Sequence, residues 1–289
     1  MKSIQNQELL SAKKLAGIIL RPNSKDLQDV YLSIKSTFNN FGIKTILDKT
    51  SAEMIGEENG YPFSELVQKS DFLVTIGGDG TLISVARRSI DFNKAILGIN
   101  LGTLGFLTSV LPEELDLFLT NFLNDDYKID ERMMINASIN DIHTVAFNDI
   151  VIKGKSVTHM VTIDAFVDNK KFNSYYGDGL VISTPTGSTA YNLSSGGPVV
   201  YPLTDAFIVT PISAHSLTQR PIVLPSDFEI ALTTNDIDGA FVLIDGQDTY
   251  ELKKGDIVKV KIAPLKSKLI RAKERDYFAV LNQKLNWGK

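Results

Sequence analysis

The chain has 289 residues, of which 43% are apolar and 22% charged, so it has the composition of a globular protein and the length for a large core in two domains. Its 34 acidic residues outnumber its 30 basic ones, and the net charge of −4 argues against a nucleic-acid-binding surface. Cysteine is absent, which excludes disulfides, thiolate nucleophiles, Cys-ligated zinc and iron–sulfur clusters.

The N-terminal residues 1–8 have no apolar stretch behind a basic start. No later segment reaches the ~18 uncharged apolar residues that a membrane helix needs. We therefore expect a soluble, cytoplasmic protein with no membrane partner and no nucleic-acid partner.

The first third of the chain alternates strand-like and helix-like segments, which is typical of βαβ units. Such alternation predicts a parallel sheet whose ligands gather at the carboxyl ends of its strands. A later helix begins near Pro112, with two acidic residues in its first turn, and ends near Asp125. The earlier strands are expected at 14–20, 43–47, 71–76 and 95–99, and the earlier helices at 26–40 and from Thr81 onward.

A glycine-rich turn, Gly77-Gly78-Asp79-Gly80, connects the third of these strands to the helix that follows it. Its glycines leave main-chain N–H groups uncovered, so Gly77 and Gly78 are candidates for phosphate binding at a helix N-terminus. A carboxylate beside bound phosphates is unfavourable for binding alone. Asp79 is therefore expected to act as a general base for a hydroxyl nucleophile or as a metal ligand. The alternative is a tight turn in which Asp79 is only the helix N-cap.

Beyond residue 128 the pattern changes to short alternating segments separated by Asn, Asp, Gly and Pro, which predicts a β-sandwich or a related all-β lobe. The fold class is thus an α/β N-terminal domain with a parallel sheet plus a β-rich C-terminal domain. The domains are expected at 1–125, 126–265 and 266–289, the last a tail whose helix (275–285) packs back on the first. The predicted strands are 134–139, 144–152, 160–167, 180–183, 228–233, 241–244 and 257–262.

A hydroxyl-rich segment surrounds Pro185 and Gly187. Its side chains can donate hydrogen bonds to phosphate or ribose oxygens, and the helix start after Gly187 offers N–H groups as well. The alternative is a polar connection with an oversupplied N-cap and Tyr191 in the core. The hydroxyls belong to Ser183, Thr184, Thr186, Ser188 and Thr189.

Asn148 and Asp149 interrupt an otherwise apolar run. Buried polar side chains need partners, so these residues mark either a turn or bulge, or a site for sugar hydroxyls. A second acidic turn, Asp245-Gly246-Gln247, is by itself more typical of a hairpin. The histidines at 143, 159 and 215 have no metal-ligand spacing, and the metal ligands therefore stay unknown. Nucleophile-elbow, Walker and dinucleotide-fingerprint motifs are absent from the sequence.

Taken together, these motifs resemble those of bacterial NAD kinases in order and spacing, over residues 14–287. The resemblance implies phosphoryl transfer from ATP to the 2′-hydroxyl of the adenosine ribose of NAD, with a divalent cation such as Mg²⁺. It also implies a homo-oligomer, either a dimer or a tetramer. The motifs are Gly77–Thr81, the loop Asn100–Leu107, Asn148-Asp149, Asp178-Gly179 with Ser183–Tyr191, and Asp245–Gln247.

The resemblance also implies individual roles. Asp79 is the catalytic proton acceptor with Gly80 beside the dinucleotide, and Asn148 and Asp149 bind ribose. Two positions depart from the family pattern: Asp149 stands where glutamate is usual, and Tyr176 where a basic residue often stands. The other implied NAD contacts are His159, Tyr176, Asp178, Thr189, Ala190, Tyr191, Asn192, Leu193, Ser194 and Gln247.

Two other functions stay open at this point. A lipid or sphingoid-base kinase can carry the same glycine loop, but it would need an apolar acyl pocket and usually a membrane-facing patch. A non-catalytic NAD sensor would have no use for a carboxylate beside the phosphates. A test for NADP formation from ATP, magnesium and NAD separates an NAD kinase from both, and offering a diacylglycerol as well identifies a lipid kinase.

Overall fold

The computed structural model describes residues 15–102, 105–155 and 159–286. Within this part the chain forms two compact units, which are described separately. Unit 1 takes its residues from 1–131 and 267–289, and unit 2 spans 132–266. The chain therefore leaves unit 1 once and returns to it near the C-terminus. Thr103 and Leu104 of the expected loop at 100–107 lie outside the described residues.

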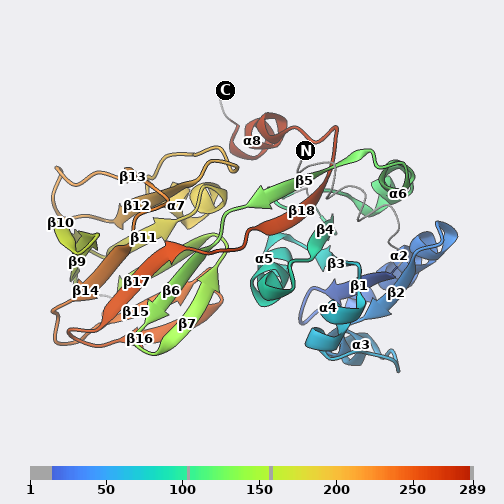
Figure 1. Ribbon diagram of the computed structural model, residues 1–289, viewed down its shortest axis with the longest axis horizontal. Helices are drawn as coiled ribbons and strands as arrows, with labels where there is room; N and C mark the ends of the chain where they lie inside the picture. The colour runs from blue at the N-terminus through green and yellow to red at the C-terminus, as the bar shows by residue number, and fades with distance from the viewer. Residues whose placement is uncertain (1–14, 103–104, 156–158, 287–289) are drawn as a thin grey trace. The chain divides into compact units, whose positions relative to one another are not determined.

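Unit 1 is built on a sheet whose six described strands lie in the order β2-β1-β3-β4-β18-β5 (Figure 1). The pairs β1–β2, β1–β3, β3–β4 and β4–β18 are parallel, so loops that follow these strands share one edge. The strands are β1 (Leu15–Leu20), β2 (Lys44–Leu47), β3 (Phe72–Gly77), β4 (Ala95–Asn100), β5 (Tyr127–Arg132) and β18 (Ser267–Ala272).

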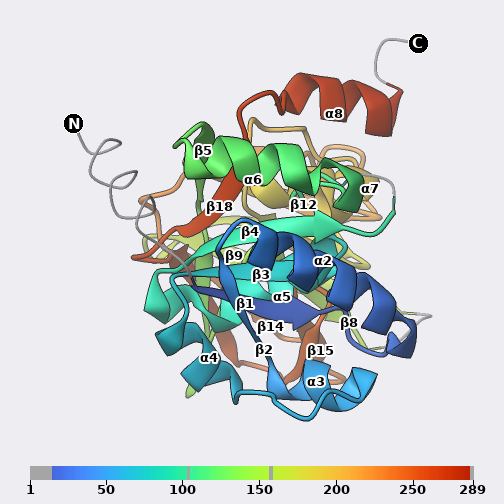
Figure 2. The same ribbon diagram turned by 90° about the vertical axis from the view of Figure 1, so that its right-hand side faces the viewer.

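Helices cover both faces of this sheet (Figure 2). Alternate residues of β3 point to opposite faces, and Phe72, Val74 and Ile76 pack with α2 and α6 in one apolar core. On the other face, Gly17 and Gly98 leave room for side chains of α4 and α5. The helices are α2 (Gln28–Asn40), α3 (Lys49–Ile55), α4 (Phe63–Lys69), α5 (Asp79–Arg88), α6 (Leu115–Leu123) and α8 (Tyr277–Leu285), with 3₁₀ turns η1 (Lys25–Leu27), η2 (Ile90–Phe92) and η3 (Pro112–Glu114).

Unit 2 is a sandwich of two antiparallel sheets, each with six described strands. One has the order β10-β9-β14-β17-β6-β7 and the other β13-β12-β11-β8-β15-β16. The strands are β6 (Ile135–Ile139), β7 (Ile142–Ala146), β8 (Asp149–Gly154), β9 (Val161–Val167), β10 (Lys170–Gly177), β11 (Gly179–Ser183), β12 (Ala206–Ile212), β13 (Ile222–Pro225), β14 (Ile230–Thr234), β15 (Ala240–Ile244), β16 (Asp248–Leu252) and β17 (Ile257–Ile262); the helical turns are η4 (Thr186–Thr189) and α7 (Tyr191–Ser194).

Inward-facing residues of both sheets form the core of unit 2, among them Ile163, Ile150 and Val242. The opposite face of the β8-containing sheet carries a smaller apolar group that includes Val151 and Leu243. Successive residues of β8 thus serve the core and the outer face in turn, as the period of a strand requires. The outer face is where the candidate site of unit 2 lies.

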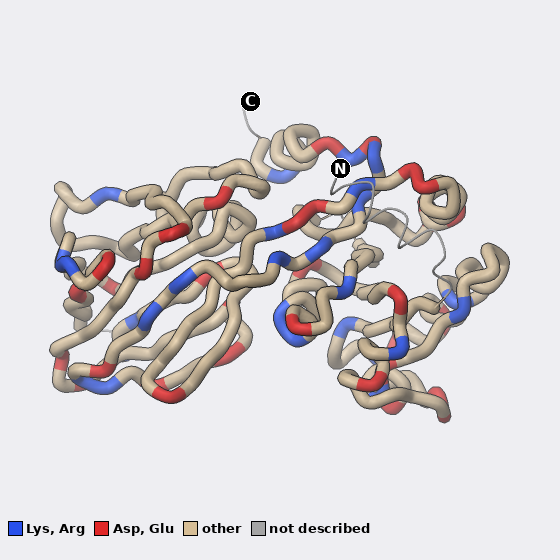
Figure 3. The backbone as a smooth tube through the Cα atoms, viewed as in Figure 1, with Lys and Arg blue, Asp and Glu red and all other residues tan. Residues whose placement is uncertain are grey.

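The expected fold class, an α/β domain with a parallel sheet plus a β-rich domain, is confirmed. One expected strand is wrong: residues 144–152 form two strands, because the chain passes from one sheet to the other at Phe147-Asn148. Basic and acidic residues are mixed along the described backbone of both units (Figure 3). None of the described helices has the length and apolar character that a membrane crossing requires.

Candidate active site

Asp79 is the first residue of α5, at the carboxyl edge of the parallel sheet of unit 1. The N-cap is Gly78, and no side chain caps the helix from that position. The Asp79 carboxylate accepts hydrogen bonds from a distant loop: Oδ2 from the Phe106 N–H at 2.8 Å, and Oδ1 from the N–H groups of Leu107 at 3.1 Å and Thr108 at 3.0 Å. The hydroxyl of Thr108 adds a fourth bond to Oδ1, at 3.2 Å. The N-cap alternative for Asp79 is therefore wrong.

The glycines of the turn serve two different purposes. A Cβ on Gly77 would lie 2.6 Å from the Thr81 hydroxyl and 2.9 Å from Arg21 Cβ, so this glycine allows close packing at the end of β3. A Cβ on Gly78 or Gly80 would meet nothing within 4 Å. The main chain at Gly78 and Gly80 therefore borders open space, where a ligand can approach it.

A cavity of about 410 Å³ on unit 2 brings together four of the predicted site residues. Asn148 and Asp149 line it from the start of β8, and Ala190 and Tyr191 from the beginning of α7. The remaining lining comes from Val151, Lys153, Leu243, Asp245 and Gly246. An apolar floor with a few convergent polar groups is the usual make-up of a small-molecule site.

Asp245 holds the Asn148-Asp149 pair in place. Its Oδ1 accepts from the N–H groups of Asn148 at 2.6 Å and Asp149 at 3.0 Å, and its Oδ2 accepts from the Phe147 N–H at 2.8 Å. Asp245 and Gly246 both have positive φ, of 51° and 63°, so the expected hairpin turn between β15 and β16 is present. The turn is thus both a hairpin and the support of the predicted ribose-binding pair.

The carboxyl of Asp149 is 4% exposed and lies near that of Asp245. Burial, together with the negative charge of Asp245, raises the pKa of Asp149 to about 7. At neutral pH this carboxyl is therefore divided between its charged and neutral forms, so it can accept a hydrogen bond from a sugar hydroxyl or donate one to it.

This pKa predicts a pH-dependent effect of Asp149→Asn on stability. Because the folded pKa is raised above the ordinary value of 3.8, the stabilising contribution of the protonated carboxyl is complete below pH ~4 and is lost as the pH rises through ~7. The free energy of unfolding of the wild type, minus that of the variant, should fall by up to about 4 kcal/mol between pH 4 and pH 8. Urea unfolding without ligand at several pH values measures this difference, and a pH-independent difference would contradict the burial argument.

Three side chains of the hydroxyl-rich segment support the main chain and do not form a ligand surface. Thr184 Oγ1 donates to the Phe147 carbonyl at 2.7 Å, Ser183 Oγ to the Asn148 carbonyl at 3.2 Å, and Ser188 Oγ to the Val200 carbonyl at 3.1 Å. The expectation that these three hydroxyls face phosphate or ribose is wrong, because buried main-chain carbonyls need them as donors. Thr184 and Ser183 thus bind the carbonyls of residues 147 and 148, whose N–H groups donate to Asp245, whereas Ser188 holds Val200.

The side chain of Asn192 is also committed to the protein interior. Its amide donates to the carbonyls of Ser188 and Pro198, both at 3.0 Å, and its Oδ1 accepts from the Thr210 hydroxyl at 2.6 Å. With no exposed surface, it fixes the start of α7 against β12. Thr189, Leu193 and Ser194 flank it in the chain and do not line the cavity.

The remaining predicted contacts lie elsewhere on unit 2. Asp178 precedes β11, and its main-chain carbonyl accepts from the Gly154 N–H at the far end of β8. Gly154 lies five residues from Asp149, which is roughly 17 Å along a strand. His159 follows soon after that end of β8. Tyr176 is 46% exposed and its ring lies 5.5 Å from that of His215. Gln247 is exposed in the β15–β16 turn and does not line the cavity.

Sequence reasoning missed Lys153 and gave Asp245 no role beyond a hairpin turn. Lys153 lies four residues after Asp149 on β8, so strand alternation places both on the outer face. It gives the cavity a cation at the end away from the two carboxyls. Alternation along 149–153 could have found Lys153 from the sequence, whereas the support by Asp245 spans 96–98 residues and left no local signal.

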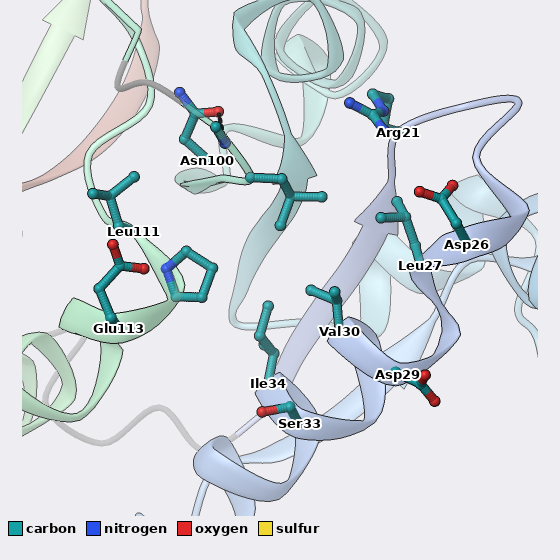
Figure 4. Close-up of a pocket in the computed structure, with 13 residues that line it drawn as sticks. Arg21, Asp26, Leu27, Asp29, Val30, Ser33, Ile34, Asn100, Leu111 and Glu113 are labelled. Carbon is teal, nitrogen blue, oxygen red and sulfur yellow. Dashed lines mark hydrogen bonds between the residues drawn. The ribbon is translucent and has the colours of Figure 1, made fainter.

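A second cavity, of about 600 Å³, opens on unit 1 at the carboxyl edge of its sheet (Figure 4). Arg21 follows β1, and Asn100 ends β4, the two strands on either side of β3 and its glycine turn. Apolar side chains of α2 line one wall, including Val30 and Ile34, and Leu111 lies on the other. The acidic side chains at the cavity are Asp26, Asp29 and Glu113.

Two family models match the chain: the ATP-NAD kinase N-terminal domain over residues 17–127 and the ATP-NAD kinase C-terminal domain over 147–272. NAD kinases of Sulfurimonas denitrificans and Wolinella succinogenes are 46% and 44% identical to it, covering 96% of this chain and 98% and 97% of those proteins. These matches extend over both units.

Solved structures agree in fold. Yeast NADH kinase complexed with NADH has a TM-score of 0.84 at 26% identity, covering 96% of this chain and 89% of that one. An NAD kinase from Archaeoglobus fulgidus in complex with ATP has a TM-score of 0.77 at 23% identity, covering 94% and 98%. With relatives of this identity matched over nearly their full length, the chain belongs to the NAD kinase family and is an enzyme of that family.

Proposed function

We propose that this chain transfers the terminal phosphoryl group of ATP to the 2′-hydroxyl of the adenosine ribose of NAD, giving NADP and ADP. The observation that carries the proposal is the carboxylate of Asp79, held by four hydrogen bonds beside glycine main chain that borders open space. Membership in the NAD kinase family supports the choice of substrates.

Asp79 Oδ2 is the proposed proton acceptor. Among the described residues Oδ1 receives three donors and Oδ2 only one. About two lone-pair sites belong to each carboxylate oxygen, so those of Oδ1 are filled and Oδ2 keeps one for the hydroxyl. In the proposed step the 2′-oxygen bonds to the γ-phosphorus, the bond from that phosphorus to the β–γ bridging oxygen breaks, and the hydroxyl proton passes to Oδ2.

The main chain at Gly78 and Gly80 is the proposed contact for the phosphates. Open space beside both residues allows an approach to the start of α5, where the helix dipole favours an anion. Gly77, in contrast, is proposed to matter through packing against Thr81 and Arg21. We place the divalent cation with the substrate as Mg-ATP, because the described residues contain no group of three or more acidic or histidine side chains that could hold one.

The cavity of unit 2 is the proposed site for the NAD ribose. Asn148 offers an amide and Asp149 a carboxyl of raised pKa, a pair that can both donate to and accept from vicinal hydroxyls. Lys153 offers a cation to the pyrophosphate. The contacts expected from His159, Tyr176, Asp178, Gln247 and residues 189–191, 193 and 194 are proposed on the family resemblance, as are a homo-oligomeric state and a cytoplasmic location. The contact expected from the Asn192 side chain is not proposed, because that side chain is buried and bonded within the protein.

The cavity of unit 1 is the proposed site for the nucleoside end of ATP (Figure 4). Its aliphatic walls suit a purine, whereas Asp26, Asp29 and Glu113 suit hydroxyl and amino donors and would repel phosphates. Arg21, between this cavity and the Gly77 main chain, favours a triphosphate that leads from one to the other.

Filling the unit 1 cavity should therefore weaken the binding of ATP and leave the binding of NAD unchanged. Ser33→Tyr places a ring in the cavity from α2 and is expected to raise KM for ATP by about tenfold, with KM for NAD unchanged. Ser36→Tyr, on the same helix but outside the lining, is the matched control. Equal KM values for ATP in both variants would place the nucleoside elsewhere.

A coupled assay tests the function as a whole. Purified protein with ATP and Mg²⁺ is offered NAD, NADH or a diacylglycerol in separate reactions. We expect NADP from NAD and no phosphorylated lipid. Phosphorylation of the lipid alone, or binding of NAD without any transfer, would overturn the proposal in favour of a lipid kinase or an NAD sensor.

A further inference from the structure

Arg271 lies buried beside the loop that holds Asp79. It belongs to β18, is 5% exposed, and its Nη1 donates to the main-chain carbonyls of Leu107 at 2.7 Å and Phe106 at 3.3 Å. Its Nε lies 3.7 Å from Oδ2 of Asp130 on β5, the neighbouring strand. A buried guanidinium needs such partners to offset its loss of water, and two of them come from one loop.

The same two peptide groups face Asp79 with their opposite ends. The Phe106 carbonyl and the Leu107 N–H form one peptide group, and the Leu107 carbonyl and the Thr108 N–H form the next. Both N–H groups donate to Asp79 Oδ1, and both carbonyls accept from Arg271. Each peptide group therefore has a cation at its oxygen and an anion at its hydrogen.

This arrangement couples the two charged side chains. A peptide dipole is favourable when its oxygen faces a positive charge and its N–H a negative one, and each bond in such a chain polarises the next. Leu107 and Thr108 are 4% and 0% exposed, so water is poorly placed to replace either partner. Removing the guanidinium would leave two carbonyls without this donor and weaken the hold of the N–H groups on Asp79.

We propose that Arg271 is a positioning residue for phosphoryl transfer, which fixes the orientation of the Asp79 carboxylate through the peptide groups 106–107 and 107–108. This inference rests on the proposed role of Asp79 as the base. Arg271 lies on the strand by which the chain re-enters unit 1, and Asp130 lies on the strand by which it leaves. The orientation of Asp79 is thereby tied to both connecting strands.

The test compares Arg271→Met with the matched control Ser109→Ala in the complete chain. Ser109 Oγ donates to the Ile270 carbonyl at 2.9 Å, so the control also removes a buried hydrogen bond between this loop and β18, but not one that involves the two peptide groups. Arg271→Met should lower kcat by about 10- to 100-fold with both KM values within about threefold, as a misplaced base predicts. Ser109→Ala should keep kcat within about twofold, and Arg271→Lys, with its charge retained, should be intermediate.

The same substitution in the Asp79→Asn background separates the inference from the proposed function. If Arg271 acts through Asp79, Arg271→Met should change the residual kcat of Asp79→Asn by less than about twofold. An equal fold-loss in both backgrounds, or a loss no larger than that of Ser109→Ala, overturns the inference and leaves the proposed function intact. Wild-type turnover by Asp79→Asn overturns both. Should Arg271→Met fail to fold, Arg271→Lys carries the same comparison.

Discussion

Asp79→Asn is expected to lower kcat by about 10²- to 10⁴-fold, the usual contribution of a general base, which corresponds to roughly 3–5 kcal/mol of transition-state stabilisation. The substitution preserves side-chain volume. The amide oxygen can keep the place of Oδ1, where three donors converge, and the NH₂ group then takes the place of Oδ2. The atom proposed to accept the proton is therefore replaced by a donor that also faces the Phe106 N–H.

Steady-state kinetics with NAD and ATP measure this loss, and thermal unfolding shows that the variant is folded. Asp71→Asn is a matched control, because Asp71 lies just before β3, at the end opposite Asp79, and accepts a main-chain hydrogen bond from the Leu15 N–H at 3.1 Å. It should keep wild-type kcat. Wild-type turnover by folded Asp79→Asn would show that Asp79 is not the general base.

Much of the fold can be predicted from local pattern. The apolar runs of β1, β3 and β4 and the glycines after them indicate a parallel sheet with its ligand edge, because the signal of each element lies within its own residues. Elements without such a signal were not expected. The strand β5 is rich in charge, and β12 contains Pro211, which argues against a strand although it pairs with Leu180 on β11.

In the candidate site, too, some residues have a local sequence signal and others do not. Asp79 is conspicuous in the sequence because it stands among glycines at a strand-to-helix turn, and Asn148-Asp149 because they interrupt an apolar run. The groups that orient them are remote: Phe106–Thr108 lie 27–29 residues from Asp79, and Arg271 lies 164–165 residues from the carbonyls it binds. Such partners depend on the order of strands in the sheet, which places β18 beside β4. The periodicity of a local segment does not indicate which distant strand will lie beside it.

Gly105→Ala is expected to lower kcat by about 10²-fold while the fold is retained, the loss that a misplacement of about 1 Å can cause. A Cβ at Gly105 would lie 2.1 Å from Asp79 Oδ1 and 2.5 Å from both Cγ and Oδ2. Real contacts of this kind are longer than 3.0 Å, so the carboxylate or the loop must move. Because the loop is also held by Arg271, the half-buried carboxylate is the part expected to give way.

Gly105→Ala tests whether the position of the Asp79 carboxylate matters, whereas Asp79→Asn tests whether its ability to accept a proton matters. The variant keeps an intact carboxylate but separates it from the N–H groups of Phe106, Leu107 and Thr108. Gly154→Ala is the matched control, since a Cβ there meets ordinary contacts of 3.4–3.7 Å. If folded Gly105→Ala keeps kcat within about threefold of the wild type, the hydrogen-bonded orientation of Asp79 is not the reactive one. A large loss of kcat with unchanged KM values means instead that the reaction requires the carboxylate in the place where this loop holds it.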